Sequence, residues 1–347
     1  MESELFLYGR FGITYARYPA QSVKTAKYVG CQAFASPEAS PSLSGWRAID
    51  LFAGIGGIRL GFAALGAETV FASEWDKDAG AVYEANFGRR PAGDLTQISP
   101  DSVPGHDLLL AGFPCQPFSI IGKREGFADT RGTLFFFIEE ILRVKRPFAL
   151  LLENVKQLRT HDEGRTFATI VGRLRQLGYF VHSAVLNALD FGLPQKRERT
   201  FIVGFRQDLP FVFPSPVGAR APLARVLESD GDVCASLFAS EAIRIRRREK
   251  IKVEPFYPSV WHENKGGNVS VLPYSCALRS NGSHNYLLIN GVRRPSVREM
   301  LRLQGFPEGF SMKAGYSVAR KLTGNSVAVP VIEAIARQMS YAAYGVF

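Results

Sequence analysis

One cysteine of the sequence stands in a setting suited to nucleophilic chemistry. Cys115 lies in the segment GFPCQPFS, where Pro114 precedes it and Pro117 follows. The prolines restrict the backbone and remove amide donors, so the thiol is held in a defined place. Because a free thiol titrates at about 8.5, a nucleophilic cysteine also needs cationic neighbours or a helix N-terminus to lower its pKa. We predict that Cys115 forms a covalent bond with a substrate.

Charged residues that could assist this thiol flank other strand-like runs. Arg197 and Arg199 belong to QKRER, just before an apolar run, and Glu153 closes another apolar run. Ligands of open α/β sheets bind outside the carboxyl ends of the strands, so these groups are expected to share one crevice. Taken singly, they are explained by a surface charge run and a capping acid. A thiol, an acid and two arginines at strand ends together favour catalysis.

A glycine-rich turn and two acids indicate a site for a nucleoside cofactor. The first strand-like run leads into DLFAGIGG, and glycines at such a turn let the backbone approach a ligand under the positive end of a helix. Glu74 follows the next run, where an acid can hold ribose hydroxyls, and Asp94 stands near the expected end of a third strand. A tight structural turn would give the same glycines. Their spacing differs from GxGxxG, which disfavours NAD or FAD.

Alternating strand-like and helix-like segments predict the fold that positions these groups. Residues 166–178 carry apolar side chains at helical spacing and end in Gly178. Strand–helix alternation predicts an α/β fold with a mostly parallel sheet covered by helices on both faces. The apolar runs expected to form its strands are 48–52, 69–73, 107–113, 148–154, 179–185 and 200–205.

The alternation divides the chain into four predicted parts. Residues 1–46 form an N-terminal extension outside the catalytic fold, and residues 47–205 form the catalytic and cofactor-binding domain. From 206 to 292 the alternation stops, and basic, glycine-rich and polar segments predict a smaller, irregular domain. Helical patterning returns at 296–306 and 325–339, so residues 293–347 are expected to complete the catalytic domain.

The composition favours a nucleic-acid partner. The 347 residues are 46% hydrophobic, enough for a sizeable core, and carry a formal net charge of +10 with a pI of about 9.5. A positive surplus of this size suggests a polyanion. No apolar run has the length of a membrane span and no export signal is evident, so we expect a cytoplasmic location. Four widely spaced cysteines predict reduced thiols and no metal site.

In order and combination, these segments resemble the motifs of the DNA cytosine-5 methyltransferases of the bacterial restriction–modification type. The resemblance runs from Ile49 to Met339 and leaves out the N-terminal extension. It implies an S-adenosylmethionine-dependent methyltransferase with a Rossmann-like fold and a target-recognition domain at 206–292. The motifs are DLFAGIGG (50–57), EWD (74–76), GD (93–94), GFPCQPFS (112–119), ENV (153–155), QKRER (195–199), REMLRLQGFP (298–307) and GNSVAVP (324–330).

The resemblance also implies a role for each site residue. Cys115 would attack carbon 6 of cytosine while Glu153 holds and protonates the ring nitrogen at position 3, so that carbon 5 accepts a methyl group from S-adenosylmethionine. Arg197 and Arg199 would orient the base and stabilise anionic groups. The residues implied to bind the cofactor are Phe52, Gly54, Gly56, Gly57, Glu74, Trp75, Asp94, Leu95, Pro114, Asn325 and Ser326.

Double-stranded DNA is the expected partner. The target base must leave the duplex before its ring is attacked, and residues 119–133, with three glycines and three basic residues, are expected to form a mobile lid. Polar segments 262–270 and 278–285 offer side chains for base edges, and the basic run 244–252 is a phosphate contact or a solvated face. We expect a monomer that acts on a short palindromic site shared with a restriction endonuclease, without a stable complex between them.

Three other functions compete with this interpretation. Cytosine methylation of RNA, as in relatives that modify tRNA, uses the same chemistry, but the separate basic domain after QKRER favours duplex DNA. A non-catalytic DNA-binding relative usually lacks the nucleophile or the cofactor glycines, and this chain has both. A cofactor-binding oxidoreductase is disfavoured by the glycine spacing and by the Pro-Cys-Gln segment.

Overall fold

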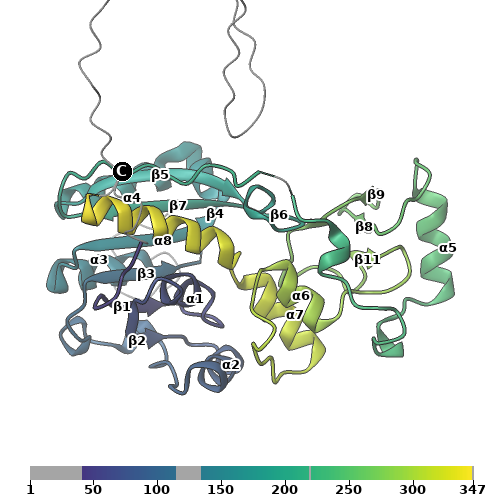
Figure 1. The fold of residues 1–347 in the computed structure, drawn as a ribbon, viewed down its shortest axis with the longest axis horizontal. Helices are drawn as coiled ribbons and strands as arrows, with labels where there is room; N and C mark the ends of the chain where they lie inside the picture. The colour runs from purple at the N-terminus through teal and green to yellow at the C-terminus, as the bar shows by residue number, and fades with distance from the viewer. Residues whose placement is uncertain (1–40, 115–133, 219, 346–347) are drawn as a thin grey trace, which may run out of the picture. The chain divides into compact units, whose positions relative to one another are not determined.

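A six-stranded sheet forms the centre of the fold (Figure 1). The structure is a computed structural model of the chain, and it describes residues 41–114, 134–218 and 220–345. All neighbouring strands are parallel except in the two pairs that contain β7, so the prediction of a mostly parallel α/β fold is confirmed. The strand order is β2 (Glu68–Ser73), β1 (Arg47–Leu51), β3 (Leu108–Gly112), β4 (Ala149–Val155), β7 (Glu198–Phe205) and β5 (Phe180–Asn187).

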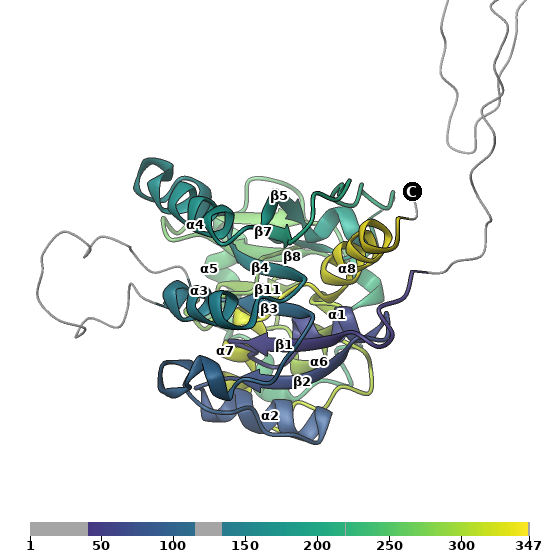
Figure 2. The same cartoon turned by 90° about the vertical axis from the view of Figure 1, so that its left-hand side faces the viewer.

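Helices cover both faces of this sheet, as Figure 2 shows. Along β3, Leu108 and Leu110 pack against the layer of α1 and α8, whereas Leu109 packs against the layer of α3 and α4. Because successive residues of a strand are buried on opposite faces, the strands form continuous apolar runs in the sequence. The four helices are α1 (Gly57–Ala63), α8 (Val329–Tyr344), α3 (Leu134–Lys145) and α4 (Arg165–Gln176).

The expected third strand before Asp94 is wrong. Among the described residues, no strand lies between α2 (Lys77–Phe87) and Asp94, which instead caps a short 3-10 helix. Hydrogen bonds hold this loop beside the end of β2, because the amide of Ala92 donates to a β2 carbonyl at 2.8 Å and the Ser73 hydroxyl donates to the Gly93 carbonyl at 2.9 Å. Asp94 therefore reaches the edge of the sheet from a loop.

The predicted helices are present, with shifted bounds near the C-terminus. Gly178 follows α4 with a φ of 87°, in the left-handed region that favours glycine. The helix expected at 296–306 is α6 (Val297–Leu303). The helix expected at 325–339 is α8, which begins at Val329 and has a proline in its first turn, and the separate helix α7 (Tyr316–Asn325) precedes it.

The residues between β7 and α6 form smaller elements around a three-stranded antiparallel sheet. Its order is β11 (Leu287–Ile289), β8 (Val260–Glu263) and β9 (Val269–Leu272), and α5 (Glu241–Lys250) packs on it. The division of the chain into domains after residue 205 and after residue 292 stays a prediction. A short parallel pair, β10 (Ser275–Cys276) with β6 (Gln195–Lys196), joins this region to the segment that directly precedes β7. The described 3-10 helices lie at Leu95–Gln97, Pro100–Ser102, Lys156–Arg159, His161–Gly164, Ala188–Phe191, Leu223–Arg225 and Ala235–Leu237.

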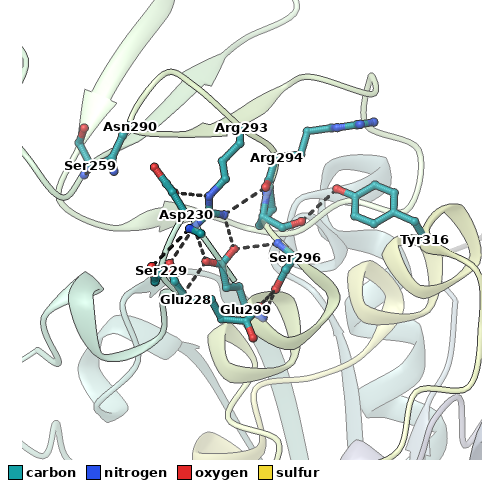
Figure 3. Close-up of polar contacts among 12 residues, drawn as sticks. Glu228, Ser229, Asp230, Ser259, Asn290, Arg293, Arg294, Ser296, Glu299 and Tyr316 are labelled. Atoms are coloured by element: carbon teal, nitrogen blue, oxygen red, sulfur yellow. Dashed lines mark hydrogen bonds and ion pairs between the residues drawn. The ribbon is translucent and has the colours of Figure 1, made fainter. Parts of the chain in front are cut away.

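A buried charge cluster fixes the joint between this region and α6 (Figure 3). The Arg293 guanidinium binds the two carboxylate oxygens of Glu299 at 2.8 and 2.9 Å. It also binds one carboxylate oxygen of Asp230 at 2.5 Å. Glu299 also accepts hydrogen bonds from the amides of Glu228 and Ser296. Arg293 and Glu299 are buried, whereas Asp230 is half exposed. The buried pair holds one geometry, because separating the partners would leave a charge buried without compensation.

The described fold begins before Arg47. Leu43 is buried, and its amide donates to the Leu65 carbonyl at 2.7 Å. The Trp46 indole donates to the Tyr344 hydroxyl at 2.8 Å. Residues 41–46, which sequence analysis assigns to the extension, thus pack against the catalytic fold. Cys115 and the predicted lid at 119–133 lie outside the described residues.

The described helices include none that is both long enough and apolar enough to cross a membrane.

The close packing of α1 on α8 gives a stability prediction. A Cβ added at Gly61 would lie 2.6 Å from an Ile332 methyl carbon and 2.8 Å from the Glu333 amide nitrogen, so Gly61→Ala should destabilise the fold by about 1–3 kcal/mol. Gly172 in α4 is the matched control, since a Cβ there meets nothing within 4 Å and Gly172→Ala should stabilise by about 0.5–1 kcal/mol. Urea unfolding checks both values, and equal effects of the two substitutions would contradict this packing.

Candidate active site

The carboxyl ends of β1, β2, β3 and β4 meet at one cavity of about 1360 Å³. Gly56 and Gly57 are not among its lining residues, and Cys115 lies outside the described residues. The remaining residues singled out from the sequence all line it: Phe52, Gly54, Glu74, Trp75, Asp94, Leu95, Pro114, Glu153, Arg197, Arg199, Asn325 and Ser326.

The glycines of the first turn serve the turn itself and its packing. Gly54 and Gly56 have φ values of 54° and 84°, in the region that favours glycine. A Cβ at Gly56 would lie 2.2 Å from the Phe87 ring, and one at Gly57 would lie 2.8 Å from the Ser326 hydroxyl. Packing thus explains Gly56 and Gly57, and their role toward a cofactor stays a prediction.

Glu74 ties the glycine turn to the end of β2. Its carboxylate accepts the Gly54 amide at 2.7 Å through one oxygen and the Asp76 amide at 2.8 Å through the other. Burial raises the pKa of Glu74, and the two amide hydrogen bonds oppose that shift. Asp76 in turn caps α2 and pairs with Lys321 of α7 at 2.5 Å. The acid is therefore held at a defined place in the cavity wall.

An exposed aromatic ring stands beside this acid. Trp75 is 75% exposed although it lines the cavity, and a large apolar side chain left open in a concave wall suits a planar ligand. Asp94 accepts the Thr96 amide at 2.9 Å, which fixes its carboxylate at the same end of the cavity. Leu95 is buried and joins the core beneath.

Glu153, which is buried, and Arg199, which is partly buried, form an ion pair in the cavity. The Nε of Arg199 lies 3.1 Å from a carboxylate oxygen of Glu153. The pair spans β4 and β7, whose antiparallel register sets Val155 opposite Arg199 and Glu153 opposite Phe201. Burial raises the pKa of Glu153, and the positive charges of Arg199 and Arg197 oppose that shift. A carboxyl group with a raised pKa is suited to proton transfer near neutral pH.

The residue after this acid positions the chain that leads to Cys115. The side-chain amide of Asn154 donates to the Phe113 carbonyl at 2.8 Å, and Asn154 is buried. This bond fixes the backbone directly before Pro114, at the edge of the described segment. The ENV motif (153–155) contains Asn154, but its pattern predicts no separate role for this residue.

Arg197 is buried and joins two backbone segments that are far apart in the sequence. Its guanidinium donates to the carbonyls of Leu278 at 3.2 Å and Gly324 at 3.1 Å, and also to the Ser326 carbonyl. Only 2% of the residue is exposed. Burial, with the nearby charge of Arg199, lowers the pKa of Arg197 to about 9. In the structure these donors are directed at the protein's own backbone. The expected contact of Arg197 with a base therefore stays a prediction.

A second wall of the cavity comes from the irregular region. Residues 263–265 at the end of β8 and residues 278–283 after β10 line it, and both ranges lie within the polar segments expected to reach base edges. Asn325 and Ser326, at the end of α7, line the cavity between these walls.

A buried acid beneath the glycine turn was missed. Asp50 is 0% exposed, its two carboxylate oxygens have no hydrogen-bond partner among the described residues, and burial raises its pKa well above the ordinary value. The signals in the sequence are an acid inside the otherwise apolar run AIDLF and its place as the first residue of the DLFAGIGG motif.

The sequence of this chain is similar to a family model and to known proteins. The family model described as C-5 cytosine-specific DNA methylase covers residues 46–341. The type II methyltransferase M.NgoBI of Neisseria gonorrhoeae is 62% identical over 289 residues, 83% of this chain and 91% of that protein. M.HaeII of Haemophilus aegyptius is 60% identical over 294 residues, 85% of this chain and 92% of that protein.

Solved structures share the fold at lower identity. The S. pombe Dnmt2 methyltransferase has a TM-score of 0.67 and 20% identity, over 86% of this chain and 99% of that one. The Entamoeba histolytica methyltransferase EhMeth has a TM-score of 0.68 and 17% identity, over 87% of this chain and 99% of that one.

The raised pKa of Glu153 predicts a pH-dependent effect on stability. Between its ordinary value of 4.5 and the raised value, the folded protein keeps a proton that the unfolded chain has lost, so the free energy of unfolding falls as pH rises through this window. Glu153→Gln should remove that part of the fall. The variant's stability relative to the unchanged chain should therefore rise from about pH 4 to about pH 7.

Urea unfolding at both pH values measures this difference. Effects of the substitution that do not depend on ionisation, such as changed packing or hydrogen bonding, are equal at both pH values, so only the slope carries the test. Glu333→Gln, at an exposed position of α8, controls for the substitution itself. A stability difference for Glu153→Gln that does not vary with pH would show that burial does not raise this pKa.

Proposed function

This chain belongs to the C-5 cytosine-specific DNA methylases, and from that membership we propose that it methylates a cytosine flipped out of a short duplex sequence, with S-adenosylmethionine as donor and Cys115 as nucleophile. It is a DNA cytosine-5 methyltransferase of the restriction–modification type. One observation carries the proposal: a single cavity is lined by the Glu153–Arg199 pair and by Glu74 beside the exposed Trp75.

Glu74 and Trp75 fit S-adenosylmethionine. Trp75 offers an open ring face for the adenine, and Glu74 offers carboxylate oxygens, already oriented by two amides, for the ribose hydroxyls. Asp94 would accept from the adenine amino group, and Asn325 with Ser326 would close the pocket from the end of α7. When bound, S-adenosylmethionine supplies an electrophilic methyl group.

Glu153 and Arg199 would act on the target base. A buried carboxyl with a raised pKa holds a proton that it can donate to the ring nitrogen at position 3. Arg199 orients that carboxyl through the 3.1 Å ion pair and limits the shift of its pKa. Protonation at position 3 draws electron density from carbon 6, which prepares that atom for a nucleophile.

Cys115 would form the covalent bond. Its thiolate attacks carbon 6 as Glu153 protonates position 3, and the electron pair displaced from the 5,6 double bond makes carbon 5 nucleophilic. After carbon 5 has accepted the methyl group, a base removes the remaining carbon-5 proton. The electrons of that bond restore the double bond and expel the Cys115 thiolate, and the proton at position 3 returns to Glu153. Asn154 supports this step by fixing the backbone before Pro114.

Duplex DNA would bind across the second wall. Residues 263–265 and 278–283 would reach base edges, since they line the cavity that receives the flipped base. The basic run of α5 divides into two sets. Arg247 is buried and pairs with Glu263 at 2.7 Å, whereas Arg244, Arg246 and Arg248 are exposed and would contact phosphates.

The relatives from restriction–modification systems indicate which partners this chain would have. They support DNA as the substrate and do not favour the alternative of RNA methylation. We expect a monomer in the cytoplasm that shares its site with a restriction endonuclease and forms no stable complex with it. Residues 206–292 would hold most of the groups that choose the sequence.

Covalent trapping tests the role of Cys115. Duplex DNA with 5-fluorocytosine in the target site should trap the enzyme, because the fluorine cannot leave carbon 5 as a proton does. Peptide mapping should locate the adduct on Cys115. Cys115→Ser should form no adduct, and Cys234→Ser, at an exposed cysteine, should be trapped like the unchanged chain. An adduct on another cysteine, or active enzyme that gives no adduct, would refute the assignment.

Calorimetry tests the role of Glu74. Glu74→Ala should weaken S-adenosylmethionine binding by about 1.5–3 kcal/mol, roughly tenfold and more, because charge-assisted hydrogen bonds to the ribose are lost. DNA affinity without cofactor should barely change. Glu84→Ala, at an acid paired with Arg90 on the surface, serves as the control. Normal cofactor affinity in folded Glu74→Ala would contradict the assignment.

A further inference from the structure

A short segment of the second wall is fastened to the catalytic part of the chain. We call Leu278–Ser283 the reading segment. It lines the cavity, and Arg279, Asn281 and Ser283 within it are exposed. Its backbone, by contrast, is bound at both ends by side chains that lie outside residues 206–292. Two of these side chains, Arg197 and Arg320, together with Gly324 of α7, form what we call the seat.

The first end of the reading segment is held by Gln195 of β6 and by Arg197, which lies between β6 and β7. The Leu278 amide donates to the Gln195 side chain at 3.3 Å, and the Leu278 carbonyl accepts from Arg197 at 3.2 Å. Gln195 is 0% exposed and also donates to the Leu303 carbonyl at 2.8 Å. Both polar groups of the Leu278 backbone are therefore satisfied by the catalytic part of the chain.

The other end is held from α7. One nitrogen of the Arg320 guanidinium donates to the carbonyls of Gly282 and Ser283, each at 3.0 Å. Arg320 is not among the residues that line the cavity. Its contact with the reading segment therefore supports the segment's backbone from behind.

The middle of the reading segment rests on a glycine of α7. A Cβ at Gly324 would lie 2.4 Å from the Ser280 nitrogen and 2.6 Å from the Arg279 carbonyl carbon. These are backbone atoms, so the segment itself would have to move. Gly324 has no positive φ, so its own backbone conformation does not require glycine. Because glycine weakens a helix interior relative to alanine, the close approach of the reading segment explains it.

We propose that the choice of DNA sequence is set jointly by the reading segment and by its seat, Arg197, Arg320 and Gly324. The inference rests on the proposed function, in which the reading segment contacts base edges. Side chains that discriminate bases must be held within a fraction of an ångström, and the seat fixes the backbone that carries them. Arg197 also binds the Gly324 and Ser326 carbonyls, so one residue aligns the reading segment with the end of the cofactor pocket.

Arg320→Met and Gly324→Ala test the seat. For each full-length variant, kcat/KM is measured on a duplex that carries the methylated site and on a duplex with one base pair of that site changed. The ratio of the two values is the discrimination. We expect it to fall about tenfold in both variants, the scale of one lost base contact. Arg337→Met, at an exposed arginine paired with Glu333 on α8, is the matched control and should keep the ratio.

Two further measurements are needed. One distinguishes an effect of the seat on discrimination from a general loss of stability, and the other tests the proposed recognition by the reading segment. Thermal unfolding reports any loss of stability, which alone would not change the discrimination of the folded enzyme. Asn281→Ala and Arg279→Ala test the reading segment directly and should lower the ratio. If they do so while both folded seat variants keep it within twofold, the seat inference is wrong and the proposed recognition stands. If neither reading-segment variant changes the ratio, the proposed recognition fails and the inference with it. Should Gly324→Ala fail to fold, Arg320→Met decides.

Discussion

The burial of Glu153 beside Arg199 is the constraint around which the active site is arranged. Removing a carboxylate from water is costly, so burial raises its pKa, and an arginine 3.1 Å away keeps that cost within what a fold can tolerate. The pair lies on neighbouring antiparallel strands, so the central sheet sets its geometry. That sheet is covered on both faces, which leaves the strand ends as the place where polar groups gather.

Backbone contacts made by buried side chains align the other parts of the cavity with this pair. Arg197 binds carbonyls from the irregular region and from the junction of α7 and α8, while Asn154 binds the carbonyl that precedes Pro114. The buried Arg293–Glu299 pair fixes the joint between the irregular region and α6. These side chains hold the elements that would contact DNA and cofactor, so substitutions at such buried positions can alter function without touching a ligand.

The sequence predicts the central sheet well because its strands are buried on both faces and so appear as apolar runs. Glu153, Glu74 and Trp75 are found for a related reason, since polar or aromatic residues at the ends of such runs must lie at one edge of the sheet. The strand expected before Asp94 is wrong because side-chain and backbone hydrogen bonds hold a loop there. The contacts of Arg197 and Arg320 join residues far apart in the chain, and no local pattern encodes such partners.

The central claim is that Glu153 carries the proton transfer on which cytosine methylation depends. Bisulfite sequencing of DNA from cells that express the chain or its Glu153→Gln variant tests this most directly. The unchanged chain should leave protected cytosines at one short recurring sequence, and the folded variant, bound to the same DNA with similar affinity, should leave none. Protection at the same sites by Glu153→Gln would contradict the account.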